Sequence, residues 1–418
     1  MPVLTSLPPI EPGRSSVERW VHSNLADLLC DSAVGSPAFS GGQTVADQAL
    51  VGLDVAGYAR RRSMVHPPSA RGATKLSPYI RHGLLPLRRV WNEVRDADKY
   101  DRFRFQGELL WQDYSRHWYA LYGNATSSPV LSEQVRAVKD WPHEPWWPDM
   151  ECMKETVAEL HVDGWCVNQT RMWLASQHSV RARAPWQSGE NEMFVHLLDG
   201  SRAANRFGWQ WSAGTSRSRG GGFARQQVIK RAPDFCKRCK LQDACPIAGY
   251  AKTEPRARVE PPAIIEPNVA FGPSAPIEHA DPTYVWLTAE SLGDADPALV
   301  AHPELPVGFV FDESLLAKLR LSGKRLVFLA ETLADLGQRR DLTLFRGDPL
   351  DFISAERTAT TFAPVPGFRR LAAAAEIAVL HPWEWLRPPT PAYLAVLEEK
   401  RRPPSFKDFC RLTKPATA

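Results

Sequence analysis

The residues between Asn168 and Trp211 combine side chains that a hydrophobic core does not need. Amide, guanidinium and carboxylate groups alternate there with apolar and indole side chains. The set comprises Asn168, Arg171, Met172, Trp186, Asp199, Asn205, Trp209 and Trp211. A flat, redox-active ring needs apolar walls and polar contacts at its edges, so this mixture favours a pocket for such a ring.

Three of the seven cysteines lie close together in the chain, at Cys236, Cys239 and Cys245. The first two form a Cys-x-x-Cys pair, which can reach one ion or one edge of a cluster, and a third sulfur nearby can close a face. Seven unevenly spaced cysteines do not resemble a disulfide scaffold. We interpret the group as a metal site, with three unrelated buried thiols as the alternative.

The elements that must position these residues change character along the chain. Residues 1–250 read as mainly helical, for example 150–161, with Met153, Val157 and Leu160 at helical spacing, and 192–198. Residues 251–282 are rich in Pro, Glu and Ala with little periodicity, which predicts a semi-extended linker.

After residue 282, short apolar runs alternate with amphipathic segments. We expect helices at 313–320 and 326–338, and strands at 284–287, 307–311, 342–345, 361–365 and 377–380. Alternating strands and helices predict a parallel sheet. The fold class is therefore an all-helical domain (1–250), a Pro-rich linker (251–282) and a Rossmann-like α/β domain (283–418).

Composition and charge narrow the class of protein. The 418 residues are 44% hydrophobic and 23% charged, as in globular proteins, and suffice for two or three domains. No apolar run is long enough for a membrane span and no secretion signal is apparent, so we expect a cytoplasmic protein. Residues 1–250 contain 31 Lys and Arg against 25 Asp and Glu, with ten against one in 201–240. This favours a polyanionic partner, or otherwise a solvated basic face.

The order and spacing of the residues around Asn168–Trp211 resemble the flavin pocket of the cryptochrome/photolyase family. Residues 58–215 resemble the family's helical FAD domain, and residues 284–311, with later segments, its α/β antenna domain. Family members usually have these domains in the opposite order, so the chain resembles a circularly permuted member, with 251–282 as the new joint. The resemblance implies FAD as cofactor and ultraviolet-damaged DNA as partner.

The resemblance implies roles around the flavin for Tyr58, Thr74, Ser77, Arg171, Asp199 and Asn205. Tyr58 and the Thr74–Ser77 turn match phosphate contacts, although an ordinary helix cap is an alternative for the turn. Arg171 and Asp199 match a pair beside the ring, with a buried salt bridge as the alternative. Asn205 matches the residue facing flavin N5. Ser201 and Gln112 differ from the family pattern.

The same resemblance implies a lesion pocket made of Glu108, Trp111, Asn168, Met172 and Trp211, and a DNA-phosphate contact at Arg62. Relatives that repair (6-4) photoproducts have histidines at the positions of Asn168 and Met172, so the pocket favours cyclobutane dimers. Gln169 replaces an arginine that is common in dimer photolyases. Plain helix residues are the alternative for Glu108 and Trp111.

Two further features follow from the resemblance. Trp209 and Trp186 match the first members of an electron-transfer relay, with Trp141, Trp146 and Trp147 as candidates for the third, although buried tryptophans are commonly core residues. One branch of the family binds a [4Fe–4S] cluster, which here implies the ligands Cys152, Cys236, Cys239 and Cys245. Cys166 is the fallback fourth ligand, and zinc is the alternative metal.

The leading hypothesis is a blue-light-driven deoxyribodipyrimidine photolyase. The alternatives are a cryptochrome-like photoreceptor that acts on a signalling partner, and a flavin and iron–sulfur redox protein that works in the dark. An antenna chromophore of unknown identity is possible, although Thr288–Ser291 replaces the arginine-rich turn of relatives after the first strand.

Overall fold

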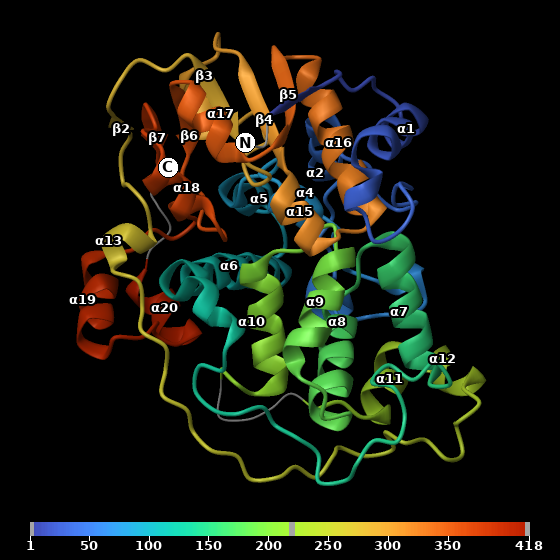
Figure 1. Cartoon of the computed structure of the whole chain (residues 1–418). Helices are drawn as coiled ribbons and strands as arrows, with labels where there is room; N and C mark the ends of the chain where they lie inside the picture. The colour runs from blue at the N-terminus through green and yellow to red at the C-terminus, as the bar shows by residue number, and fades with distance from the viewer. Residues whose placement is uncertain (1–3, 217–221, 414–418) are drawn as a thin grey trace.

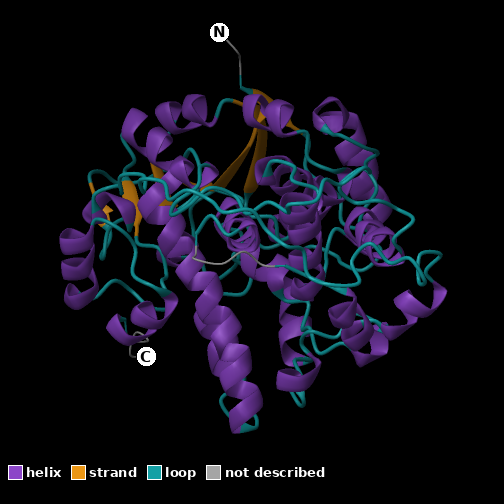
Figure 2. Cartoon of the chain, turned by 90° about the horizontal axis from the view of Figure 1, so that it is seen from below, coloured by secondary structure: helices purple, strands orange, loops and turns teal. Residues whose placement is uncertain are grey.

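The computed structural model describes residues 4–216 and 222–413 of the chain. A seven-stranded sheet with its own helices forms one end of the molecule, and a larger helical region forms the other (Figure 1). Seen from below, most of the molecule is helix and loop, and the strands lie together at one side (Figure 2). The predicted combination of a helical region and an α/β region is confirmed. No helix in the described part of the chain is both long and apolar enough to cross a membrane.

The sheet has the order β1-β5-β4-β3-β6-β7-β2. The strands are β1 (Thr5–Leu7), β2 (Ile277–Glu278), β3 (Tyr284–Leu287), β4 (Val307–Asp312), β5 (Leu342–Gly347), β6 (Thr358–Thr361) and β7 (Val379–His381). The five central strands are parallel, as predicted. From β3 in the middle, the order continues through β4 to β5 on one side and through β6 to β7 on the other. Both edge strands are antiparallel to their neighbours. Strand β1 comes from the N-terminal residues and β2 from the segment 251–282.

The predicted strand at 361–365 is largely wrong. The strand β6 ends at Thr361, and Pro364 beyond it has no N–H to donate to a sheet. The strand predicted at 377–380 is β7, which begins two residues later, at Val379.

Alternating side chains of the central strands build two cores. Val285, Phe309 and Phe311 belong to a large core on one face of the sheet. Trp286 and Val310 point to the other face, because successive strand residues alternate. Gly308 allows Phe352 to pack against the strand, since a Cβ there would lie 2.2 Å from the Phe352 ring.

Apart from α13, α19 and α20, the helices fall into two groups by their position along the chain. Those that follow strands of the sheet are α14 (Pro297–Ala301), α15 (Glu313–Leu319), α16 (Gly323–Gly337), α17 (Pro349–Ala355) and α18 (Phe368–Ala374). Those between β1 and residue 250 are α1 (Arg14–Leu25), α2 (Gln43–Val51), α3 (Tyr58–Arg61), α4 (Ser77–Arg81), α5 (Leu87–Glu93), α6 (Lys99–Tyr122), α7 (Glu151–Asp163), α8 (Asn168–Ala175), α9 (Trp186–His196), α10 (Arg202–Ala213), α11 (Arg225–Arg231) and α12 (Pro233–Arg238). A π-helical turn, η4 (Ser176–Arg181), extends α8.

Helix α16 joins the two regions. It packs against α1, and its Arg325 donates to the carbonyls of Phe194 and Gly200 in the helical region. Burial lowers the pKa of Arg325 to about 9, so its charge is retained near neutral pH. The large core continues from the sheet into residues such as Leu85 and Phe105, so the two regions share one apolar interior.

The segment 251–282 runs along the helical region and is mostly irregular, with single bridges at Thr253 and Arg258 and one short helix, α13 (Pro267–Ala270). The last helices, α19 (Pro391–Lys400) and α20 (Phe406–Leu412), return to pack beside α6 (Figure 1). They lie against the helical region rather than the sheet.

Candidate active site and cysteine pocket

A buried ion pair joins α8 to the loop before α10. Arg171 donates to both carboxylate oxygens of Asp199, at 3.0 and 2.8 Å, and its Nε donates to the Cys166 carbonyl at 3.0 Å. Burial alone would lower the pKa of Arg171, but Asp199 outweighs it and the pKa is raised. Asp199 therefore keeps the Arg171 guanidinium protonated and fixed in orientation, although the pair as a whole is neutral.

Asn205, on α10, is bound to a residue that the sequence reasoning missed. Its Nδ2 donates to the carbonyl and to Oε1 of Glu190, both at 2.9 Å. Glu190 is only 2% exposed and also accepts from Arg202 at 2.5 Å, with Arg206 Nε 3.6 Å away. These contacts fix the orientation of the Asn205 amide. A glutamate in a helix between two tryptophans carries no distinctive sequence signal of this role.

Tyr58 is the first residue of α3 and is buried beside Phe105. The carboxylate of Asp101 accepts from the N–H groups of Gly57 and Ala59, at 2.7 and 2.8 Å, and so holds the start of this helix. Burial raises the pKa of Tyr58, which keeps its hydroxyl protonated.

Thr74 and Ser77 lie in the turn that opens α4, where Lys75 has a positive φ of 58°. Ser77 Oγ accepts from the indole of Trp165 at 3.0 Å. Arg81, at the end of α4, donates to the Gly200 carbonyl at 3.0 Å. The helix that follows the turn therefore contacts the residue next to Asp199.

Glu108 and Arg62, for which the sequence predicts separate contacts to a lesion and to a phosphate, form a salt bridge with each other. Burial raises the pKa of Glu108, and Arg62 opposes this shift. The two side chains are 34% and 31% exposed, so both remain within reach of a ligand.

The two tryptophans of the expected lesion wall are in contact. The rings of Trp111 and Trp211 lie 5.5 Å apart at 73°, an edge-to-face arrangement that makes an L-shaped wall. Trp111 is not an open surface, however. Phe406 of α20 stacks on it at 3.6 Å and 8°. No pattern in the sequence predicts a residue of the last helix at this position.

The other two expected lesion residues come from α8. Asn168 is exposed at the first position of this helix. Met172 is half-buried, and its sulfur accepts from the hydroxyl of Ser212 on α10 at 3.4 Å.

Trp209 and Trp186 are both buried, at 2% and 1% exposure. No ring contact joins them among the described residues, but Gly189, one turn after Trp186, packs against the Trp209 ring, where a Cβ would lie 2.2 Å from it. Of the three candidates for a third relay member, Trp146 lies nearest, with its ring 6.5 Å from that of Trp209. His178 lies between α8 and α9 and contacts both rings.

The four cysteines predicted as ligands line one pocket formed by α7, α12 and the loop that follows α12. All are free thiols. Burial raises the pKa of Cys152, and the other three sulfurs raise it further. Within the described chain, the groups of ligand atoms that lie within 4.8 Å of one another do not include this set. Cys166 is buried elsewhere, with its thiol near the Thr156 carbonyl.

The basic segment 201–240 is described except for residues 217–221, so Arg217 and Arg219 lie outside the described residues.

The turn Thr288–Ser291 after β3 contacts the helical region, since Glu290 pairs with Arg81 at 2.5 Å.

Parts of the chain are similar to known proteins. Residues 105–235 match the family described as the FAD binding domain of DNA photolyase. The chain is 28% identical over 234 residues to a deoxyribodipyrimidine photo-lyase of Vibrio cholerae, a match that covers 50% of this chain and 49% of the relative. It is 31% identical over 172 residues to that of Thermus thermophilus, covering 38% of each. The chain thus spans half or less of the length of these relatives.

Solved structures with partial similarity include an archaeal photolyase of Sulfolobus tokodaii, with 22% identity, a TM-score of 0.39 and coverage of 50% of each chain. A cryptochrome of Synechocystis has 20% identity and a TM-score of 0.41, over 50% of this chain and 48% of the other. The matched FAD-binding segment contains Arg171, Asp199 and Asn205. Residues 105–235 are therefore similar to the FAD-binding domain of DNA photolyases.

Proposed function

We propose that the chain is a light-driven flavoprotein that repairs cyclobutane pyrimidine dimers in DNA, as a deoxyribodipyrimidine photolyase. The observation that carries the proposal is the Arg171–Asp199 pair, placed in the matched FAD-binding domain next to the Asn205–Glu190 bonds. Reduced FAD, when bound and excited by blue light, supplies the electron that splits the dimer and takes it back afterwards.

The residues of the flavin site fit this group. The guanidinium of Arg171, fixed by Asp199, favours negative charge on a ring beside it. Glu190 holds Nδ2 of Asn205, which directs the amide oxygen to the other side. Tyr58, Thr74 and Ser77 offer hydroxyl groups at helix starts for the phosphates.

In the lesion pocket, Glu108 accepts or donates at the edge of the flipped pyrimidines, and Asn168 and Met172 line the same side. Trp111 and Trp211 form the stacking wall, and such stacking contributes about 1–3 kcal/mol per base. Arg62 serves both as the partner of Glu108 and as a DNA-phosphate contact. Trp209 and Trp186 serve as electron donors to the flavin, and Trp146, whose ring lies 6.5 Å from that of Trp209, is the candidate for a further donor.

The cysteine pocket is proposed as the site of a [4Fe–4S] cluster. A single tetrahedral zinc ion with bonds of about 2.3 Å would bring its sulfurs to about 3.8 Å of one another. The wider spacing of these four sulfurs suits a cluster of several irons better. Iron content measured on the purified protein tests this: we expect about four irons per chain, lost in Cys236→Ser and retained in Cys410→Ser.

The domain assignment remains a proposal as well: a helical FAD-binding domain first, a joint at 251–282, and an antenna-like α/β domain last, in permuted order. The parallel strands all follow residue 282, which supports it. An antenna chromophore is proposed for the pocket at the carboxyl ends of β3 and β6, lined by residues that include Arg116, Asp296 and Trp383. Ligands of open α/β sheets bind where the strand order reverses.

The repair assay tests the function directly. Duplex DNA that contains a single cyclobutane dimer is illuminated with blue light, and the loss of the dimer is counted per enzyme. We expect Glu108→Ala to lower the rate by about tenfold or more, since a hydrogen bond to a charged group contributes about 1.5–3 kcal/mol. Glu93→Ala, an exposed glutamate on α5, is the control. If wild-type protein with bound, reduced flavin repairs no dimer, the proposal is wrong.

The stacking of Phe406 on Trp111 favours a second candidate, a cryptochrome-like photoreceptor without repair activity. A base can stack on that face of Trp111 only after Phe406 is displaced. This candidate predicts light-driven flavin reduction, equal and weak binding to damaged and undamaged duplex, and a protein partner for signalling. Tighter binding to the damaged duplex would contradict it.

A further inference from the structure

A second cluster of metal-ligating side chains lies far from the cysteine pocket along the chain, where α7, α9 and the loop after α1 meet. His161 lies near the end of α7, and Glu192 and His196 lie one turn apart on α9. One ligand atom of each of these three residues lies within 4.8 Å of the others. The same is true of His196 with Cys30 and Asp31, so the two groups share one imidazole.

The distances in the first group suit coordination better than hydrogen bonding. Glu192 Oε1 lies 3.4 Å from His161 Nε2 and 3.6 Å from His196 Nε2. These exceed the 2.7–3.2 Å or so of a direct N–H···O bond. Around a tetrahedral ion with bonds of about 2.0–2.1 Å, neighbouring ligand atoms lie about 3.4 Å apart. The two distances to Glu192 therefore match ligands around one ion, and the two imidazole nitrogens lie within 4.8 Å of each other.

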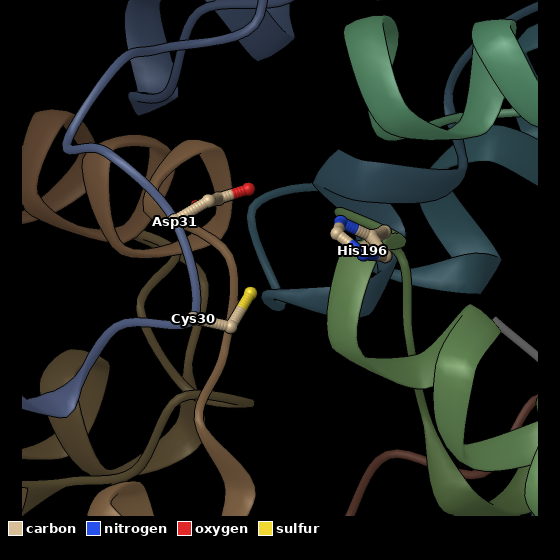
Figure 3. A group of neighbouring side chains, drawn as sticks. All are labelled: Cys30, Asp31 and His196. Carbon is tan, nitrogen blue, oxygen red and sulfur yellow. The ribbon is translucent and has the colours of Figure 1, made fainter.

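The second group is a poorer site for a cation. Figure 3 shows Cys30 and Asp31 on the N-terminal loop, opposite His196 on α9. The ammonium of Lys324 lies 3.5 Å from Asp31 Oδ2 and 3.5 Å from His196 Nδ1. Its positive charge opposes an ion on the Nδ1 side of the imidazole. On the Nε2 side, the charged group that contacts the ring among the described residues is the Glu192 carboxylate. An ion on Nε2 puts the ring proton on Nδ1, so Lys324 then keeps only its pair with Asp31.

The site is also accessible. The side chains of His161 and Glu192 are 43% and 46% exposed, whereas that of His196 is 13% exposed. An ion can enter from solvent, and water can complete its coordination. Two imidazole nitrogens and one carboxylate oxygen form a donor set that binds Zn²⁺ and the other late divalent ions of the first transition row.

We propose that His161, Glu192 and His196 bind a divalent transition-metal ion of the zinc class, which ties α7 to α9. This site is separate from the flavin and cysteine sites and does not depend on the proposed repair activity. Its position has a structural consequence, because α7 carries Cys152 and α9 carries Trp186 and Glu190. A bound ion would stabilise the packing of these two helices.

Titration calorimetry with Zn²⁺ on the purified full chain, after treatment with a chelator, tests the proposal. We expect one binding event in wild-type protein, weakened about tenfold or more in His161→Ala and in His196→Ala, because loss of even an outer-shell partner costs about 10–100-fold. His22→Ala, an exposed histidine on α1, is the matched control. Cys236→Ser should retain the event, which separates it from metal uptake by the cysteine pocket.

A spectroscopic measurement tests the same assignment without reliance on affinity. With Cu²⁺ as the probe, electron paramagnetic resonance should show coupling to two imidazole nitrogens in wild-type protein and to one in His161→Ala. His161 is exposed, so the variant should fold, and circular dichroism checks this. Zinc binding that survives in His161→Ala but is lost in Cys30→Ser would place the ion in the second group and overturn the proposal, as would no uptake at all.

Discussion

At the scale of single residues, the account depends most on the Arg171–Asp199 pair. Asp199 is 6% exposed and Arg171 24%, so removing one partner leaves the other charge buried without compensation. We expect Asp199→Asn to lower the free energy of unfolding by about 3 kcal/mol, as is typical when a buried pair is broken. Urea unfolding of the flavin-free protein measures this.

The control for that change is Asp140→Asn, which breaks a surface pair. Asp140 is 91% exposed and bound to Arg183 at 2.7 Å, and such pairs contribute at most about 1 kcal/mol. Equal losses of stability in the two variants would show that the Arg171–Asp199 pair stabilises the fold no more than a surface pair does.

A buried carboxyl on α6 gives a prediction about pH. Asp113 is fully buried and accepts from the N–H groups of Leu386 and Arg387, at 3.3 and 2.9 Å. Burial raises its pKa to about 7, against about 3.9 in the unfolded chain. The folded state therefore keeps a proton that the unfolded state releases between these values. Its contribution to stability is full below about pH 4 and is lost as the pH rises to about 7, by up to about 1.4 kcal/mol per pH unit.

The comparison of wild type with Asp113→Asn isolates this effect. Burial lowers the pKa of the neighbouring His117 to about 3 in the folded state, against about 6.5 in the unfolded chain. Its opposite pH dependence is common to both proteins and cancels in the comparison. Urea unfolding at intervals from pH 4.5 to 7 should show a wild-type stability that declines relative to the variant. The Asp113→Asn change lowers the free energy of unfolding by the same amount at every pH, because its amide has one acceptor oxygen for two donors. Parallel pH profiles would contradict the raised pKa.

Much of the site at this scale follows from sequence. The resemblance led us to expect Arg171 with Asp199, Trp111 with Trp211, and Cys152 with the other three cysteines, and these residues lie together. Their roles in binding stay predictions. Glu190 and Phe406 could not be found, because neither carries a spacing signal. Their roles arise from contacts between elements that only the fold brings together.

At the scale of elements, α20 decides how open the proposed lesion pocket is. Phe406 covers one face of Trp111, and its neighbour Phe409 is fully buried beside Tyr114. The helix is therefore anchored in the core next to the pocket. A base that stacks on this face of Trp111 has to displace Phe406.

Truncating that side chain should expose the stacking surface. We expect Phe406→Ala to bind dimer-containing duplex several-fold more tightly than wild type, since a stacked base contributes about 1–3 kcal/mol and no ring has to be displaced. Fluorescence anisotropy at fixed salt measures the affinity. Phe103→Ala, which alters an exposed phenylalanine on α6, should leave it unchanged. An unchanged or weaker affinity in Phe406→Ala would show that this face of Trp111 does not receive a base.

The elements themselves were predictable where the apolar period is clear. Strands β3, β4 and β5 and helices α7, α15 and α16 lie close to their expected positions. The edge strands β1 and β2 could not be predicted, because strands of three and two residues owe their existence to a neighbouring edge rather than to their own pattern.

At the scale of the whole molecule, the order of the regions along the chain does not match their separation in space. The strand β1 joins the sheet, whereas α19 and α20 pack on the helical region. Helix α16 is buried along most of its length between them. The two regions therefore share a core that neither can complete alone.

A chain that ends at residue 282 should accordingly lack cooperative folding. It would lose β3–β7 and α16 and expose the apolar residues of α1 that pack on them, such as Trp20 and Val21. Near-ultraviolet circular dichroism with urea should show a sharp transition for the full chain and a broad one for the fragment. A sharp transition in the fragment would mean that the helical region is autonomous.

The central claim is that the helical region binds FAD at Arg171, Asp199 and Asn205 so that light can draw an electron from Trp209. The most direct measurement is the visible absorption spectrum of the purified protein, before and during blue illumination. The account predicts bound flavin in equimolar amount that becomes reduced in the light, at a rate that falls sharply in Trp209→Phe. A colourless protein that takes up no added FAD would contradict it.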